Sequence, residues 1–197
     1  MSVPIRVVLA ALVGGIITFF WGAVAHIALP LGEMGMSTVA ENEEKPLQEA
    51  LARSLGHEGL FIVPGGPMRE EMNEEARLAW EKAHADDPTA FIVYRPRMGA
   101  MMPPSLLMNE AMSNVLAAGL AAVILALSAT GFAGRVAICV LIGVTGWLSI
   151  SFSYWNWYTF PADFSLAELA MQAIGWLVSG VPMALLVRGR VAVTSPA

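Results

Sequence analysis

Four apolar stretches, at residues 7–29, 115–133, 136–153 and 166–187, constrain this chain more than any other feature. A helix needs about 20 predominantly apolar residues to cross the hydrocarbon core of a bilayer, and each stretch is close to that length. Helices also satisfy their own backbone hydrogen bonds, which lipid cannot do. The sequence therefore predicts an α-helical membrane protein with four transmembrane helices.

A hydrophilic insert, residues 31–105, separates the first stretch from the second. Within it, Glu41–Gly56 and Arg69–Ala85 have helical patterns, and Gly59–Pro64 and Ala90–Tyr94 are short apolar runs typical of strands. We expect the two strands to pair, with both helices covering one face of the sheet. A core of this size is marginal alone, so the small α/β domain is expected to rely on the membrane helices.

The basic residues outside the insert predict the orientation. Arg6 precedes the first stretch, Arg135 lies between the second and third, and Arg188 and Arg190 follow the fourth. The link at residues 154–165 contains no Lys or Arg. Short basic segments remain in the cytoplasm, so both termini are predicted to be cytoplasmic, and the insert and this link extracytoplasmic. The predicted location is the bacterial inner membrane, with the insert in the periplasm.

This orientation divides the chain into seven predicted parts. They are a cytoplasmic N-terminus with transmembrane helix 1 (1–30), an extracytoplasmic α/β domain (31–105), helix 2 (106–133), helix 3 (134–153), an external aromatic loop (154–165), helix 4 (166–187) and a cytoplasmic tail (188–197).

An alternative for the N-terminus stays open. Arg6, the apolar run at residues 7–20 and the Ala-Val-Ala sequence at residues 23–25 have the form of a signal peptide with its cleavage site. Against cleavage, the apolar stretch continues through Leu29, and Trp21 is bulky for a position just before a cleavage site. We expect the segment to be retained as a membrane anchor.

Charge and cysteine content exclude several functions. Of the 16 acidic residues, 13 lie between Glu33 and Asp87, so the net charge of −5 is a property of the insert. Nucleic-acid binding needs a basic face, and no nucleic-acid partner is expected. The single cysteine, Cys139, can form neither an intrachain disulfide nor a paired-cysteine zinc site. With no catalytic or nucleotide-binding motif, neither an enzyme activity nor a cofactor is expected.

Small residues recur at a spacing of four in three of the apolar stretches. They are Ala11 and Gly15; Ala118, Ala122 and Ala126; and Gly175 and Ser179. Such stripes let helix backbones approach closely. Together they predict a compact bundle.

Three ionisable residues, His26, Glu110 and Glu168, are predicted at similar depth near one end of the helices. Ionisable residues inside a membrane are functional candidates by default, and one histidine with two carboxylates is a candidate metal site. Alternatively, the carboxylates stabilise helix N-termini and His26 donates to a backbone carbonyl. We expect His26 and Glu110 to pair.

Two further segments carry candidate binding residues. Met98, Met101 and Met102 belong to a methionine-rich stretch whose thioethers suit Cu(I), although methionine also fills irregular apolar gaps. In the aromatic link, residues 154–165, the predicted lipid-interface residues are Trp155, Trp157 and Tyr158. The alternative for these aromatic rings is a stacking platform for a lipid or quinone headgroup.

The segment Trp21–His26, continuing into Leu29–Glu33 (the pattern WGxxxH…LPLGE), resembles the start of a family of small bacterial four-helix membrane proteins with no known activity. The resemblance continues loosely through Gly59–Pro64 and the Trp155–Pro161 segment. It implies the same four-helix architecture. It carries no functional residue onto this chain.

The leading hypothesis for function is a non-catalytic accessory or scaffold component of an envelope complex, acting through the external domain. Its expected partners are the lipid bilayer and a membrane protein, a periplasmic protein or a second copy of the chain. The alternative is a transporter-like or ligand-binding protein that handles a metal ion such as copper, or a lipid, at the outer membrane face.

Overall fold

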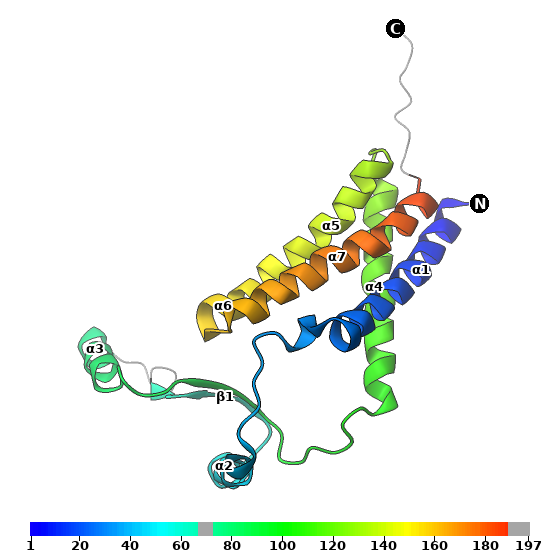
Figure 1. The fold of residues 1–197 in the computed structure, drawn as a ribbon. Coiled ribbons are helices and arrows are strands. Elements are labelled where there is room, and N and C mark those ends of the chain that lie inside the picture. The colour runs from blue at the N-terminus through cyan, green and yellow to red at the C-terminus, as the bar shows by residue number, and fades with distance from the viewer. Residues whose placement is uncertain (67–72, 189–197) are drawn as a thin grey trace. The chain divides into compact units, whose positions relative to one another are not determined.

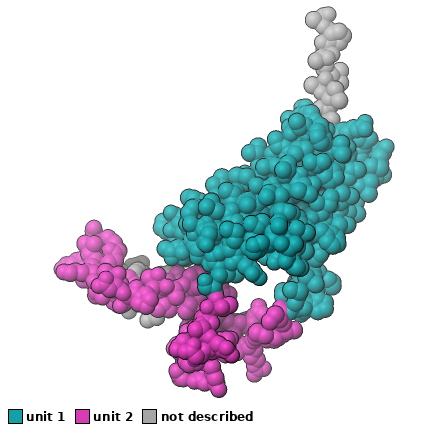
Figure 2. Space-filling view, viewed as in Figure 1, with its two compact units in different colours: residues 1–37, 102–197 teal, residues 38–101 magenta. Residues whose placement is uncertain are grey.

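The computed structural model describes residues 1–66 and 73–188 (Figure 1). The chain divides into two compact units (Figure 2). One unit, here called the bundle, is Met1–Ser37 with Met102–Ala197, and the other, here called the insert, is Thr38–Met101. Arg190, most of the predicted tail and the first residues of the predicted Arg69–Ala85 helix lie outside the described residues.

The bundle contains four helical segments long and apolar enough to cross a membrane, as predicted. They are α1 (Val3–Ala23) continued by the π-helix η1 (Val24–Ala28), α4 (Pro104–Leu127), α5 (Phe132–Ser149) followed by α6 (Ser151–Tyr158), and α7 (Ala162–Leu186). In Figure 1, α7 lies between α1 and α5, and it packs on both. The other main contact of α1 is with α4.

Several predicted boundaries were wrong. Helix 2 was expected to reach residue 133, but α4 ends at Leu127, and the residues before Phe132 link it to α5. Residues 154–165 were expected in a loop, but residues 154–158 belong to α6 and residues 162–165 to the start of α7. Aromatic residues do not stop a helix, whereas the left-handed Thr159 and the following Pro161 do.

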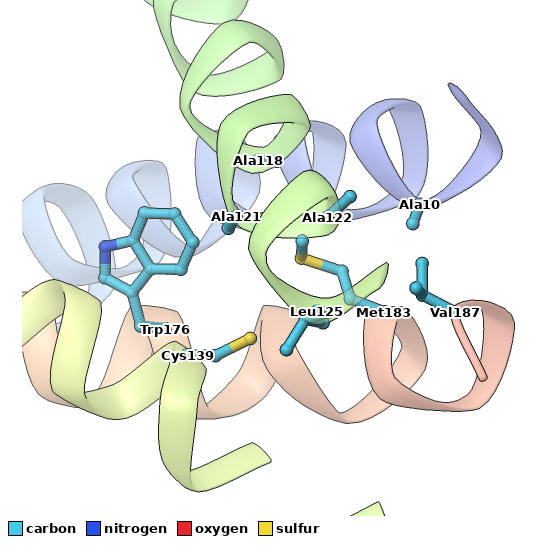
Figure 3. Close-up of a cluster of buried hydrophobic side chains, with 9 residues drawn as sticks. All are labelled: Ala10, Ala118, Ala121, Ala122, Leu125, Cys139, Trp176, Met183 and Val187. Carbon is cyan, nitrogen blue, oxygen red and sulfur yellow. The ribbon is translucent and has the colours of Figure 1, made fainter. Parts of the chain in front are cut away.

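The bundle core is built mainly from small residues packed around a few large side chains (Figure 3). Its buried members are Ala10, Ala118, Ala121, Ala122, Leu125, Cys139, Trp176, Met183 and Val187. The predicted close packing is confirmed where helices cross. A Cβ built at Gly15, one of the predicted small residues, would lie 2.5 Å from the Cα of Val115, so α1 and α4 meet there only because residue 15 has no side chain.

Arg135 does not lie in a loop, as the sequence suggested, but in the first turn of α5, where it is buried. Its Nε donates to the carbonyl of Ala184 in α7 (3.2 Å), and its Nη1 donates to the carbonyl of Thr130 (2.7 Å). The last four carbonyls of a helix have no partner within the helix, and a cation there also complements the helix dipole. Arg135 therefore caps the C-terminal end of α7.

The insert has the predicted order of helix, strand, helix and strand. The elements are α2 (Glu41–Ser54), β1 (Gly59–Val63), α3 (Glu74–Ala83) and β2 (Ala90–Tyr94). The two strands pair antiparallel, with Leu60 opposite Val93 and Phe61 opposite Ile92.

The prediction that both helices cover one face of this sheet was wrong. Neither α2 nor α3 packs extensively on the strands, and no residue of the insert that the structure describes is buried. The indole of Trp80 in α3 lies where a side chain at Gly66, just after β1, would project. Both helices are rich in charge, so neither offers an apolar face wide enough to cover a sheet.

Candidate functional site

The end of α1 is distorted into a π-helical turn. The N–H of Leu29 donates to the carbonyl of Val24, five residues back, at 2.9 Å. The histidine His26 lies in the middle of this turn, and its side chain is exposed. Single π-helical turns inside α-helices occur frequently at functional sites. We call this part of the bundle, where α1 ends and α7 begins, the His26 end.

The chain that follows folds back over His26. A short 3₁₀ helix, η2 (Pro30–Glu33), brings Gly32 so close that a Cβ there would overlap the imidazole ring. Gly35 then turns with a φ of +74°, a conformation that favours glycine. A Cβ on Gly35 would lie 2.7 Å from the Asp163 carboxylate at the start of α7. The two glycines therefore allow η2 to dock against both η1 and α7.

Glu168 lies close enough to His26 for their charges to interact. It is half-buried in the first turns of α7. The two residues belong to segments that are far apart in the sequence, and each is ionisable within an apolar segment. In the part of the chain that the structure describes, neither a hydrogen bond nor an ion pair joins them. Ionisable side chains in such a setting are candidates for holding a polar ligand.

The structure does not join His26 to Glu110. Glu110 is exposed, and its carboxylate accepts from the Asn114 amide on the same helix at 3.0 Å. Within the described residues, neither a hydrogen bond nor an ion pair links it to His26, and no three histidine, cysteine or acidic side chains are grouped to hold a metal ion. From the sequence, His26 and Glu110 could be placed at a similar position along their helices. The sequence did not indicate the direction in which each side chain faces around its helix axis.

Two tryptophans fix α7 at this same end of the bundle. The indole of Trp21 in α1 donates to the carbonyl of Met171 at 2.9 Å, and the indole of Trp147 in α5 donates to the carbonyl of Ser165 at 2.8 Å. Neither contact was predicted from the sequence. A tryptophan in an apolar helix needs a hydrogen-bond acceptor for its indole N–H. That need could have marked both residues as contacts between helices.

A groove of about 360 Å³ opens beside Trp147, between α5, the start of α6 and α7. Its lining is mostly apolar, with Gly146 and Trp176 on facing helices, and Ser151 and Gln172 supply the polar groups. A Cβ built on Gly146 would meet nothing within 4 Å, so the groove is open at that position. No sequence pattern indicated it.

The three aromatic residues proposed for the lipid interface occupy different environments. Trp155 is half-buried, and its ring packs edge-on against Phe152, which in turn contacts Trp147. Trp157 is 76% exposed, and Tyr158 is also on the surface. The aromatic contact between α6 and α5 is that of Phe152 with Trp147, and Trp155 packs beside it within α6. Contact of Trp155, Trp157 and Tyr158 with lipid stays a prediction.

The methionines proposed as copper ligands are all exposed. Met98 and Met101 lie in the insert, and Met102 is the first residue of the second bundle segment. None of the three fills a gap in the bundle core. Copper binding by these thioethers stays a prediction.

Comparisons with protein-family models, with curated proteins and with solved structures find no match to this chain.

Proposed function

We propose that the chain is a multi-pass protein of the bacterial inner membrane that acts as a non-catalytic accessory or scaffold, binding a partner protein through its periplasmic insert. The observation that carries this proposal is the sheet in the insert. It is folded and apolar, yet no residue of the insert that the structure describes is buried.

Both faces of the sheet are apolar. On one face, Leu60 is 66% exposed and lies opposite Val93, which is 76% exposed. On the other face, Phe61 lies opposite Ile92. An antiparallel sheet with one face in water normally alternates apolar and polar residues, and two strands alone are marginally stable. A sheet of this kind is suited to be covered by another protein surface.

The periplasmic placement is supported by the basic residues. Arg6 in α1, Arg135 in α5 and Arg188 after α7 all belong to the same end of the bundle, where Figure 1 also shows the N-terminus. The positive-inside rule assigns this end to the cytoplasm. The opposite end, from which both connections to the insert leave, then faces the periplasm.

Affinity purification of the full chain from membranes in a mild detergent, followed by mass spectrometry, tests the proposal. A protein partner in stoichiometric amount should copurify with the wild type. It should be lost with Leu60→Thr combined with Val93→Thr, because threonine keeps the strand propensity but removes the apolar surface. The control is Leu78→Gln, which changes an exposed leucine on α3. A partner retained by the threonine variant, or none with the wild type, contradicts the proposal.

A second candidate is a protein that binds a lipid at the outer membrane face, and the groove beside Trp147 favours it. An acyl chain fits an apolar groove whose polar groups, Ser151 and Gln172, can meet a headgroup or ester. Native mass spectrometry of the purified protein should show a retained lipid. Gly146→Trp, which fills the groove, should release it, while Gly22→Ala, at a position with open space, should not.

The same candidate class includes copper binding by the exposed methionines. Purified protein should retain Cu(I) against a competing chelator, because thioethers are soft ligands. The variant with leucine at Met98, Met101 and Met102 should lose the ion. Equal retention by both proteins, or retention by neither, removes copper from the candidates.

A further inference from the structure

The groove beside Trp147 contains a buried hydrogen-bond donor that the fold does not use. The indole of Trp176 lines this groove, and only 9% of the residue is exposed. The indoles of Trp21 and Trp147 each donate to a backbone carbonyl of α7, but among the described residues nothing accepts from the Nε1 of Trp176. A buried donor without a partner costs free energy, and a bilayer offers no water to satisfy it. The N–H of Trp176 therefore needs an acceptor from another molecule.

The N–H edge of this indole lies where α5 and α7 meet. A Cβ built on Gly143 in α5 would overlap the Cδ1 of Trp176, the ring carbon bonded to Nε1, and would lie 2.9 Å from the carbonyl oxygen of Gln172. Figure 3 shows the nitrogen on the side of the ring turned away from Leu125 and Met183. Across the residues that the structure describes, every fully enclosed side-chain nitrogen or oxygen has a partner. The unpartnered Nε1 is therefore not enclosed, and it is open to the groove that its ring lines.

The rest of the groove favours a small, uncharged and flat occupant. None of the described residues that line it is ionisable, so it offers no cation to hold a phosphate headgroup. Two indole rings supply aromatic surface. The side chains of Ser151 and Gln172 also lack a hydrogen bond to any described residue, so both are available to a ligand. A volume of about 360 Å³ is at the small end of ligand sites, which suits a single headgroup better than two acyl chains.

We propose that this groove binds the ring of a membrane quinone, with one ring carbonyl accepting a hydrogen bond from the Nε1 of Trp176. The proposal rests on the second candidate function, lipid binding in this groove, and names the class of lipid. A quinone is flat and uncharged, and it carries two carbonyls on one ring. Gln172, one turn before Trp176 on α7, or Ser151 in α6 donates to the second carbonyl. The apolar tail leaves through the open side of the groove at Gly146.

Binding of a benzoquinone with a short alkyl tail to the purified full chain tests the hydrogen bond. Isothermal titration calorimetry in mild detergent measures the affinity and does not depend on tryptophan fluorescence. Trp176→Phe keeps an aromatic ring but removes the N–H, so it should weaken binding about three- to tenfold. Trp80→Phe makes the same change in α3 of the insert and should bind like the wild type. Equal affinity of Trp176→Phe and the wild type overturns the proposal.

A second variant keeps the test decisive if Trp176→Phe does not fold, which its melting temperature shows. Gly146→Trp fills the groove at a position where an added Cβ meets nothing within 4 Å, and it should abolish quinone binding. Retained binding by this variant overturns the proposal.

Solvent extraction of the purified wild type, followed by chromatography, should also yield a copurified quinone. If the wild type instead holds a phospholipid that Gly146→Trp releases, and binds no quinone, the quinone proposal fails while lipid binding stands. A wild type that holds neither contradicts both.

Discussion

The glycines that shape the His26 end matter because they have no side chain and so let two segments of backbone pack closely. Gly32 lies under the imidazole of His26, and Gly35 turns beside Asp163. The sequence singled out His26 and Glu168 because they are ionisable in apolar surroundings, and both belong to this end. It could not indicate that they lie near one another, because the rotation of a helix about its axis depends on which neighbours it packs against. An almost uniformly apolar helix such as α1 carries no pattern that marks this rotation.

Replacing Gly32 tests the packing over His26. Gly32→Ala adds a methyl group where the imidazole lies, so either η2 or His26 must move. We expect a loss of about 1–3 kcal/mol in the free energy of unfolding, the usual cost of overpacking. Thermal unfolding in detergent measures it. Gly22→Ala is the matched control, because nothing lies within 4 Å of the added carbon and its melting temperature should not fall.

A pair of double-mutant cycles tests which carboxylate His26 meets. His26→Ala and Glu168→Gln should be coupled by about 0.2–1 kcal/mol in unfolding free energy, the range for a pair whose histidine is exposed to solvent, because removing either leaves the other without its electrostatic partner. His26→Ala and Glu110→Gln should be additive, since Glu110 is bonded within its own helix. Coupling in the second cycle but not in the first would contradict the arrangement at the His26 end.

At the scale of elements, the four long helices and the helix–strand–helix–strand order of the insert were predictable, whereas the packing of the helices on the sheet was not. Hydropathy marked the four long helices, and composition marked β1 and β2. Element α6 was missed because its aromatic residues suit a helix and a membrane interface equally well. The prediction that α2 and α3 cover the sheet failed for a physical reason. A helix covers a sheet through a wide apolar face, and the charged α2 and α3 lack one.

The contact between α5 and the end of α7 depends on Arg135. Arg135→Met keeps the length of the side chain but loses the hydrogen bonds to Ala184 and Thr130. We expect destabilisation by about 1–3 kcal/mol, because the carbonyls lose a charged donor in a buried setting. Thermal unfolding in detergent is the measurement. Arg6→Gln is the control and should unfold close to the wild type, because Arg6 is only partly buried and donates to the carbonyl of Met1 at the start of the chain rather than to another helix.

At the scale of the whole molecule, orientation is the prediction on which the proposed function depends. Reporter fusions after Val187 and within the link at residues 128–131 should both read cytoplasmic, and a fusion between Ser54 and Gly59 should read periplasmic. The fusion positions lie outside the helices and strands, so they leave the elements intact. A cytoplasmic insert would exclude both the periplasmic scaffold and any ligand site at the outer face.

The position of α7 also has a consequence for biogenesis. The chain is synthesised from its N-terminus, so α1 and α4 can pair early, whereas the main contact of α5 is with α7, which is made after it. Until the 25 residues of α7 are in place, Trp21 and Trp147 lack the carbonyls that accept from their indoles, and Arg135 has the carbonyl of Thr130 but not that of Ala184. The packing of this bundle is thus completed only after α7 is made.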